Sequence, residues 1–461
     1  MVTFKKWSSK IVLEIFDAAL KILVYRLLFV VLFILSGISL PQTISDTDTL
    51  TKGSNLPACV QYALSHYPAV RQSLLDEEIT GRTAKSKLAD WFPQLNFTFN
   101  LQHNFQLPVS VFGGNTVQIG SRNTSIGQFS LTQTIFNRDV ILASSTAEDL
   151  IRQSEQRTLS NKINVVVNVS KAFYAVLLTS QQIQLLSDDI ARLNRSLQDA
   201  LNQYRAGVVD KTDYERASIA LNNAKAQKKQ ADEALKTSFA FLKQQMGYPS
   251  KADLRLDYDT TKMESEAIID TNQVLDYQKR IEYQLLQSQR SLLAANISYS
   301  ELGFLPSLNA FGSYNLDYLN NSFSQLYKTM HPNSFVGLQL SIPIFEGGKR
   351  YQEIKIAKLE LTRSDYDVVA FKDAANTEYT QTLSNYKSNL TNYYALKTNL
   401  NLARDVYNTI ELQYRAGIKT YLDVITAETD LRTTQINYIN ALFQVLSSKL
   451  DVQRALGIIH F

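Results

Sequence analysis

Side chains that could build a catalytic or metal site are scattered along this sequence. The histidines are His66, His103, His331 and His460, which fall in separate parts of the chain. Local spacing therefore assembles no metal-binding or nucleophilic group. No glycine-rich phosphate loop follows a strand pattern. The sequence predicts that the protein is not an enzyme, and no metal or other cofactor is expected.

Tyrosine, arginine and acidic side chains instead gather around a short motif that occurs twice. Residues 203–208, Gln-Tyr-Arg-Ala-Gly-Val, return almost unchanged as residues 413–418, Gln-Tyr-Arg-Ala-Gly-Ile. A fresh helical pattern begins near Thr212 in the first copy and near Thr420 in the second. An arginine followed by glycine at the end of a helical pattern indicates a helix terminus. The shared positions are Arg205 with Gly207 and Arg415 with Gly417. Each motif therefore predicts the turn of a helix hairpin.

The helices that lead into these turns carry the same apolar seam. The first seam consists of Ile183, Leu186, Ile190, Leu193, Leu197, Ala200 and Tyr204. The second consists of Tyr393, Leu396, Leu400, Ala403, Tyr407, Ile410 and Tyr414. Steps of three and four residues alternate, which is typical of helices packed side by side as a coiled coil. The chain is therefore predicted to be two copies of one unit.

The duplication divides the chain into consecutive parts. They are a signal peptide (1–40), an N-terminal linker (41–55), a first repeat (56–246), a second linker (247–271) and a second repeat (272–461). The apolar run 27–35 lies between basic and small residues, as in an export signal, and an uncleaved anchor is the alternative. Most of the net charge of +4 lies in this front part, so nucleic-acid binding is not indicated. No later segment is expected to be a transmembrane helix.

Cys59 is the only cysteine, so an internal disulfide is excluded. It lies far beyond the apolar run, which argues against a lipoprotein cleavage site. We expect a small, buried side chain on a helix.

Four stretches alternate apolar with polar residues, as β-strands do. They cover about 95–107, 125–136, 307–318 and 336–344, and their polar members are almost all Asn, Gln, Ser and Thr. Their length suits strands that cross a bilayer, and an uncharged polar face suits a water-filled lumen. The alternative is a half-buried soluble sheet. Four strands cannot close an open barrel, so a pore would need at least three copies of the chain.

Helical patterns occupy most of the remaining chain. One pattern runs from residue 56 to 90, and about 100 Å of helix leads from each strand pair to its turn. Shorter helices return over about 212–246 and 420–456. Residues 108–122 and 319–333 are expected to be outer loops.

This order of elements resembles the TolC-like outer-membrane efflux protein family, over essentially all of the chain after residue 55. The resemblance rests on Ala63-Leu64, Pro93-Gln94-Leu95, Pro306-Ser307-Leu308, Ile344-Phe345-Glu346-Gly347-Gly348, Tyr414-Arg415-Ala416-Gly417 and Tyr421-Leu422-Asp423-Val424. It implies a homotrimer in outer-membrane lipid, with a twelve-stranded β-barrel continued by a periplasmic α-helical barrel. It also implies that the helix tips dock with a periplasmic adaptor and an inner-membrane pump.

The resemblance further implies a gate at the periplasmic end of the channel. A ring aspartate falls on Asp423, and the residues that hold the closed state fall on Tyr414 and Lys419. Their partners fall on Thr212 and Asp213. Lys419 replaces the family's arginine and lacks its two-pronged hydrogen bonding, which predicts a less tightly held closed state.

The residues themselves leave plainer roles open. Three symmetry copies of Asp423 would converge on one axis, where like charges attract cations and raise one another's pKa. The alternative is a solvated helix residue. The family's second acidic ring position is Thr426 here, which predicts weaker cation binding. Arg205 and Arg415 either contact the adaptor or only complement helix C-termini.

The preferred function is a passive exit duct, powered by a partner, for drugs or other small toxic compounds. Type I protein secretion uses similar ducts, and the sequence does not separate the two. A hypothesis from another class is an exported coiled-coil scaffold or adhesin.

Overall fold

The computed structural model describes residues 53–257, 260–459 and 461. The predicted signal peptide (1–40) and most of the predicted linker 41–55 lie outside these residues. The chain separates into a unit of residues 1–50 and a unit of residues 51–461, and the description below concerns the second unit.

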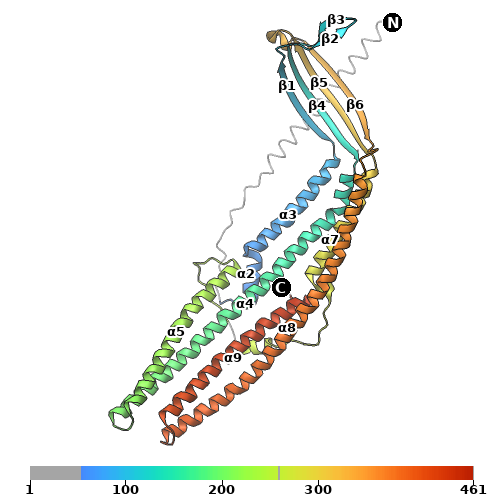
Figure 1. The fold of residues 1–461 in the computed structure, drawn as a ribbon. Coiled ribbons are helices and arrows are strands. Elements are labelled where there is room, and N and C mark those ends of the chain that lie inside the picture. The colour runs from blue at the N-terminus through green and yellow to red at the C-terminus, as the bar shows by residue number, and fades with distance from the viewer. Residues whose placement is uncertain (1–52, 258–259, 460) are drawn as a thin grey trace. The chain divides into compact units, whose positions relative to one another are not determined.

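The two halves of this unit repeat one order of elements: helix, strand pair, long helix, turn and shorter helix (Figure 1). The helices are α2 (Leu56–His66), α3 (Pro68–Leu88), α4 (Arg138–Arg205), α5 (Lys211–Met246), α6 (Thr260–Glu266), α7 (Ile281–Glu301), α8 (Lys349–Arg415) and α9 (Tyr421–Leu456). Short 3-10 helices are η1 (Ala89–Trp91), η2 (Tyr277–Lys279), η3 (Leu302–Phe304) and η4 (Phe323–Lys328). The strands are β1 (Gln94–His103), β2 (Val109–Phe112), β3 (Asn115–Gln118), β4 (Asn123–Phe136), β5 (Ser307–Asn320) and β6 (Met330–Ser341).

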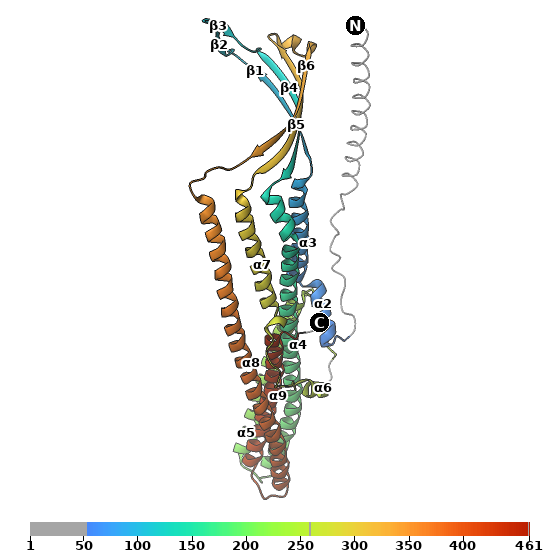
Figure 2. The ribbon, with the colours of Figure 1, turned by 90° about the vertical axis from the view of Figure 1, so that its right-hand side faces the viewer.

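The long helices connect the sheet to the two hairpin turns. Helix α4 has 68 residues and α8 has 67, so each is about 100 Å long, as the sequence predicted. Helix α5 packs along α4, and α9 packs along α8. The sheet lies at one end of this unit and both turns lie at the other (Figures 1 and 2).

One antiparallel sheet combines strands from both halves. Its order is β1-β4-β5-β6, so β4 of the first half pairs with β5 of the second. Strands β1 and β6 are its edges and are each paired on one side in the described chain. The expected four-stranded contribution of each protomer is therefore confirmed.

The two faces of this sheet differ in chemistry, and neither is covered by a long helix in the described part of the chain. Phe97, Phe99 and Leu338 are more than half exposed on their strands. Between the strands, the Gln128 amide donates to the Ser313 hydroxyl at 3.0 Å. A soluble sheet would bury its apolar side chains against a helix or a second sheet, which this one does not.

The outer loops contain more structure than the sequence predicted. Residues 108–122 include the hairpin of β2 and β3, which turns at Gly113 and Gly114 with φ of 59° and 84°. Two successive residues with positive φ fit the twist of a two-residue hairpin, and glycine reaches that region without strain. The predicted loop 319–333 contains η4, and its last residues belong to β6. The two segments connect paired strands, as predicted, but they also contain these short regular elements.

The pattern from residue 56 to 90 forms two helices because Pro68 lacks the N–H that would continue α2. Gly247, just after α5, packs against this corner. Its φ is 66°, and a Cβ placed there would lie 2.8 Å from the His66 carbonyl oxygen. Gly457, just after α9, repeats the contact in the second half, 2.7 Å from the Lys279 carbonyl oxygen.

The middle of α4 contributes a large part of the core of the unit. Val167, Val169 and Phe173 are buried, and α4 contacts α2, α3, α7 and α9. By composition, α4 contains a window apolar enough to cross a membrane, contrary to the sequence expectation, but 61% of that window is buried inside the protein. Cys59 on α2 is fully buried, as predicted, and burial raises the pKa of its thiol to about 12.

Candidate functional site

The two hairpin turns have the same backbone structure. After α4, the N–H of Gly207 donates to the carbonyl of Tyr204, and the N–H of Val208 donates to that of Gln203. After α8, the corresponding two bonds start at Gly417 and Ile418. This pair of bonds satisfies the last helix carbonyls and needs a left-handed residue. Gly207 and Gly417 supply it with φ of 72° and 74°.

The helices that leave the two turns begin differently. Helix α9 starts with a capping box, in which the Thr420 hydroxyl accepts from the Asp423 N–H and the Asp423 carboxylate accepts from the Thr420 N–H at 2.9 Å. Helix α5 starts after Asp210, whose side chain makes no cap hydrogen bond, with Asp213 in the equivalent position. Asp423 thus lies in the first turn of α9.

Hydrogen bonds to Thr420, helped by the nearby Lys419 charge, hold the pKa of Asp423 below its ordinary value within one chain. The raised pKa expected for converging aspartates would require further copies of the chain. Because its pKa is low, the isolated carboxylate remains charged at neutral pH, as a cation site requires.

Tyr414 joins the two hairpins near their turns. Its hydroxyl donates to the Gln203 side-chain oxygen at 2.9 Å. Its ring lies 5.8 Å from the ring of Tyr421, beside buried Ala200 and Ala217. Burial is the main reason that the pKa of Tyr414 is raised. The phenol therefore remains a neutral hydrogen-bond donor.

The other predicted gate residues surround this contact. Thr212 and Lys419 are exposed, and Asp213 is partly buried at the start of α5. The Tyr414 hydroxyl bonds to Gln203 rather than to Thr212 or Asp213, although the Asp213 charge contributes to the raised pKa of Tyr414. Gln203 was not singled out from the sequence, although it begins both copies of the repeated motif.

The arginines of the two turns are both exposed. Arg415 pairs with Glu411, one helical turn earlier, at 2.5 Å. Residue 201, at the same distance before Arg205, is leucine, so the first turn does not repeat this ion pair.

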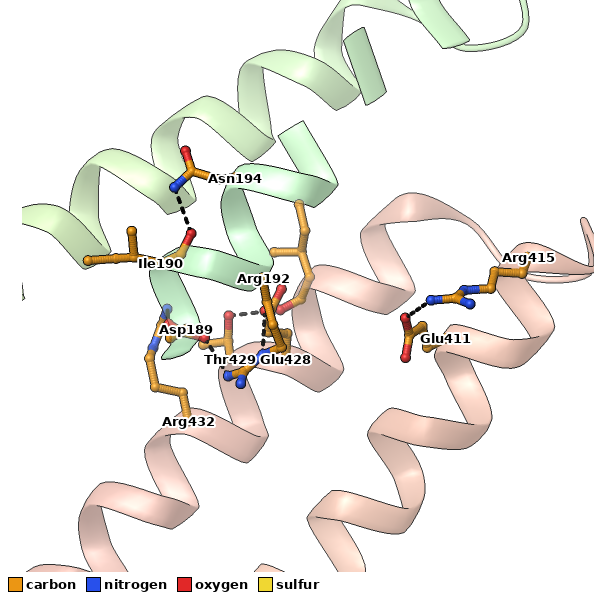
Figure 3. A network of polar contacts seen from close by, with 10 residues as sticks. Asp189, Ile190, Arg192, Asn194, Glu411, Arg415, Glu428, Thr429 and Arg432 are labelled. Atoms are coloured by element: carbon orange, nitrogen blue, oxygen red, sulfur yellow. Dashed lines mark hydrogen bonds and ion pairs between the residues drawn. The ribbon is translucent and has the colours of Figure 1, made fainter. Parts of the chain in front are cut away.

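A cluster of four charged side chains also joins the two halves, between α4 and α9 (Figure 3). Asp189 of α4 is fully buried and accepts from Arg192 of α4 at 2.9 Å and from Arg432 of α9 at 3.0 Å. Glu428 of α9 is 2% exposed and has one longer contact, 3.4 Å from Arg192 Nε. We call Asp189, Arg192, Glu428 and Arg432 the inter-hairpin cluster.

This cluster was not predicted from the sequence, although a signal was present. The buried face of α9 contains Tyr421, Val424 and Leu431, and Glu428 occupies the remaining position of the same stripe. A charged residue within an apolar stripe is rarely buried without a partner. Burial, followed by the nearby Asp189 charge, raises the pKa of Glu428 to about 7.

Comparison with known proteins identifies the family. The family model described as outer membrane efflux protein matches residues 59–248 and 282–458. TolC of Vibrio cholerae is 23% identical over 413 residues, which cover 87% of this chain and 90% of TolC. The alkaline protease secretion protein AprF of Pseudomonas aeruginosa is 21% identical over 394 residues, covering 84% of this chain and 81% of AprF.

A solved structure shares the fold. The CmeC outer membrane channel of Campylobacter jejuni matches with a TM-score of 0.70 at 15% identity, over 87% of this chain and 85% of CmeC. No enzyme activity is indicated by these relatives, and no group of three potential metal ligands occurs in the ranges that the structure describes. Since the family model matches most of both halves, this chain belongs to the outer membrane efflux protein family.

Proposed function

We propose that this chain forms the outer-membrane exit duct of a tripartite efflux system for drugs or other small toxic compounds. The observation that carries the proposal is the sheet, with exposed apolar side chains beside a polar face of amide and hydroxyl groups. The exposed apolar side chains suit contact with lipid, and the amide and hydroxyl groups suit a water-filled passage. Membership of the efflux family supports this use of the sheet.

The proposed duct is a homotrimer. Four strands are too few for an open barrel, whereas three copies supply twelve strands and pair the edges β1 and β6. The two hairpins of each copy would then build the helical barrel in the periplasm. Three copies of Asp423 would form the cation-binding constriction.

The hairpin turns are the proposed contact with a periplasmic adaptor and, through it, with an inner-membrane pump. Val208 and Ile418 are 72% and 73% exposed at equivalent places, directly after Gly207 and Gly417. The exposed Arg205 and Arg415 flank them. An exposed aliphatic side chain beside a cation, repeated in both turns, suits a protein partner.

Protein secretion is the second candidate function. It is favoured by the likeness to AprF, whose name assigns it to alkaline protease secretion. Deletion of this chain should increase susceptibility to toxic compounds under the efflux proposal. Unchanged susceptibility together with loss of a secreted protein would favour the second candidate.

Asp423→Ala and Asp423→Asn should both weaken block of the channel by multivalent cations, on the order of tenfold, because each removes a charge from the constriction. The measurement is single-channel conductance of the detergent-purified protein in a planar bilayer. The exposed Asp188 provides a matched control, since Asp188→Asn removes a charge from α4. Equal block in Asp423→Asn and wild type would exclude Asp423 from the constriction.

Tyr414→Phe combined with Lys419→Ala should raise open-channel conductance several-fold. The change removes the hydrogen bond to Gln203, worth about 1 kcal/mol in each chain, while the ring still packs on Tyr421. Tyr394→Phe is the control, because Tyr394 is an exposed tyrosine of α8. Unchanged conductance in a correctly folded trimer would reject the predicted lock.

A further inference from the structure

The inter-hairpin cluster lies at the contact between α4 of the first half and α9 of the second half. Asp189 and Arg192 are three residues apart on α4, and Glu428 and Arg432 are four residues apart on α9. Two contacts therefore cross from one hairpin to the other: Asp189 with Arg432 at 3.0 Å, and Glu428 with Arg192 at 3.4 Å. Any movement of α9 away from α4 would break both and expose the cluster to water.

The four members do not share the contacts equally. Asp189 engages both guanidinium groups at 2.9 and 3.0 Å, whereas Glu428 has one contact at 3.4 Å. Both carboxylates are almost completely removed from water. Burial disfavours an ionised carboxylate unless strong partners compensate it, so Glu428 is the member that can take up a proton while Asp189 remains paired.

Several groups surround Glu428 and determine its charge. Three charged groups interact electrostatically with it: Asp189 and Arg192 of α4 and Arg432 of α9. Its own charge acts in turn on Tyr421 of α9 and Tyr407 of α8. Burial raises the pKa of both tyrosines, so they are neutral near pH 7. Glu428 is therefore the group of this set whose charge changes near neutrality.

We propose that the inter-hairpin cluster is a proton-linked interlock, in which Glu428 binds a proton while α9 packs on α4 and releases it when the hairpins separate. The proposal rests on the proposed function, because it assigns a regulatory role to hairpin movement in a duct. The packed arrangement is favoured in acid. A rise in pH shifts the equilibrium toward separated hairpins.

The direction and size of the effect follow from proton linkage. The pKa of Glu428 is raised to about 7 when buried, against an ordinary value of 4.5. Protonation of Glu428 therefore stabilises the packed state fully below pH 4.5, and this stabilisation is lost as the pH rises to 7. Between pH 5.5 and 7.5 the ratio of separated to packed hairpins should rise about twentyfold for each chain.

The test measures hairpin separation and conductance on the same full-length protein. Spin labels at Asn194→Cys of α4 and Thr433→Cys of α9 report the distance between the helices, and the buried Cys59 thiol should stay unlabelled. Distances and open probability are recorded at pH 5.5 and 7.5 at constant ionic strength. The separated population is expected to increase at the higher pH in both measurements.

Glu428→Gln keeps the size of the side chain and cannot ionise, so it should stay packed and lose the twentyfold pH response. Asp430→Asn, an exposed carboxylate of the same helix, should retain the response. A full response in Glu428→Gln, or equal wild-type distances at both pH values, would overturn the interlock. If Glu428→Gln does not fold, the wild-type distances at the two pH values still test the interlock.

The same experiment distinguishes failure of the interlock from failure of the proposed duct. If the distance depends on pH but no variant conducts, including Tyr414→Phe with Lys419→Ala, the proposed duct is overturned and the interlock is retained.

Discussion

Gly247→Ala and Gly457→Ala should each lower the free energy of unfolding by about 2–4 kcal/mol. Both glycines have left-handed φ, which disfavours alanine by about 1 kcal/mol. The added Cβ would also lie 2.8 Å from the His66 carbonyl oxygen or 2.7 Å from that of Lys279. A backbone atom cannot rotate away, so the corner must shift, and such overpacking adds roughly 1–3 kcal/mol.

Gly207→Ala and Gly417→Ala are matched controls for these two substitutions. Their φ values of 72° and 74° are nearly the same, but nothing lies within 4 Å of an added Cβ. They should therefore lose only the conformational part, about 1 kcal/mol. Denaturant unfolding of the purified protein measures all four variants. Equal losses at the corners and at the turns would show that the close approach contributes nothing.

Asp189→Ala should lower the free energy of unfolding by about 3–5 kcal/mol, because it leaves two partly buried guanidinium groups without their main partner. Asp189 is fully buried and accepts from both Arg192 and Arg432. The neighbouring Asp188 is exposed and accepts from the Gln184 amide. Asp188→Ala should change the free energy of unfolding by no more than about 0.5 kcal/mol.

A double substitution distinguishes the cost of an uncompensated charge in the inter-hairpin cluster from the cost of losing the contact between Asp189 and Arg432. Asp189→Leu with Arg432→Leu leaves Arg192 and Glu428 as a neutral pair. This variant should recover much of the stability that Asp189→Ala loses, since replacing both members of a buried pair is often near neutral. A double variant less stable than Asp189→Ala would contradict this account.

The sequence was sufficient to predict the helix hairpins and the four-stranded sheet. The seam from Ile183 to Tyr204 repeats with the period of packed helices, and the Gly207 and Gly417 turns end the long helices where expected. Strand alternation is clearest in β5, where Leu308, Ala310, Tyr314 and Leu316 lie on one face and Asn309, Ser313 and Asn315 on the other. These features depend on local periodicity, which a single sequence displays directly.

Features that depend on contacts distant in sequence were missed. The β2–β3 hairpin has strands of only four residues, too short for alternation to be clear, although Gly113-Gly114 is a readable turn signal. The inter-hairpin cluster joins residues 189 and 432, and nothing local pairs them. Gln203 was also missed, because its contact with the Tyr414 hydroxyl joins residues that are far apart in the sequence. The roles of Asp423, Lys419, Thr212 and Asp213 in gating remain predictions.

The free edges of the sheet affect how every stability measurement on this protein must be designed. Strands β1 and β6 each present a row of backbone groups unpaired in the described chain, and such rows bind other strands. Chain association and folding are therefore linked by mass action, and dilution alone should lower the melting temperature. Variants must be compared with wild type at one fixed chain concentration, because a weakened edge would otherwise be mistaken for a weakened core.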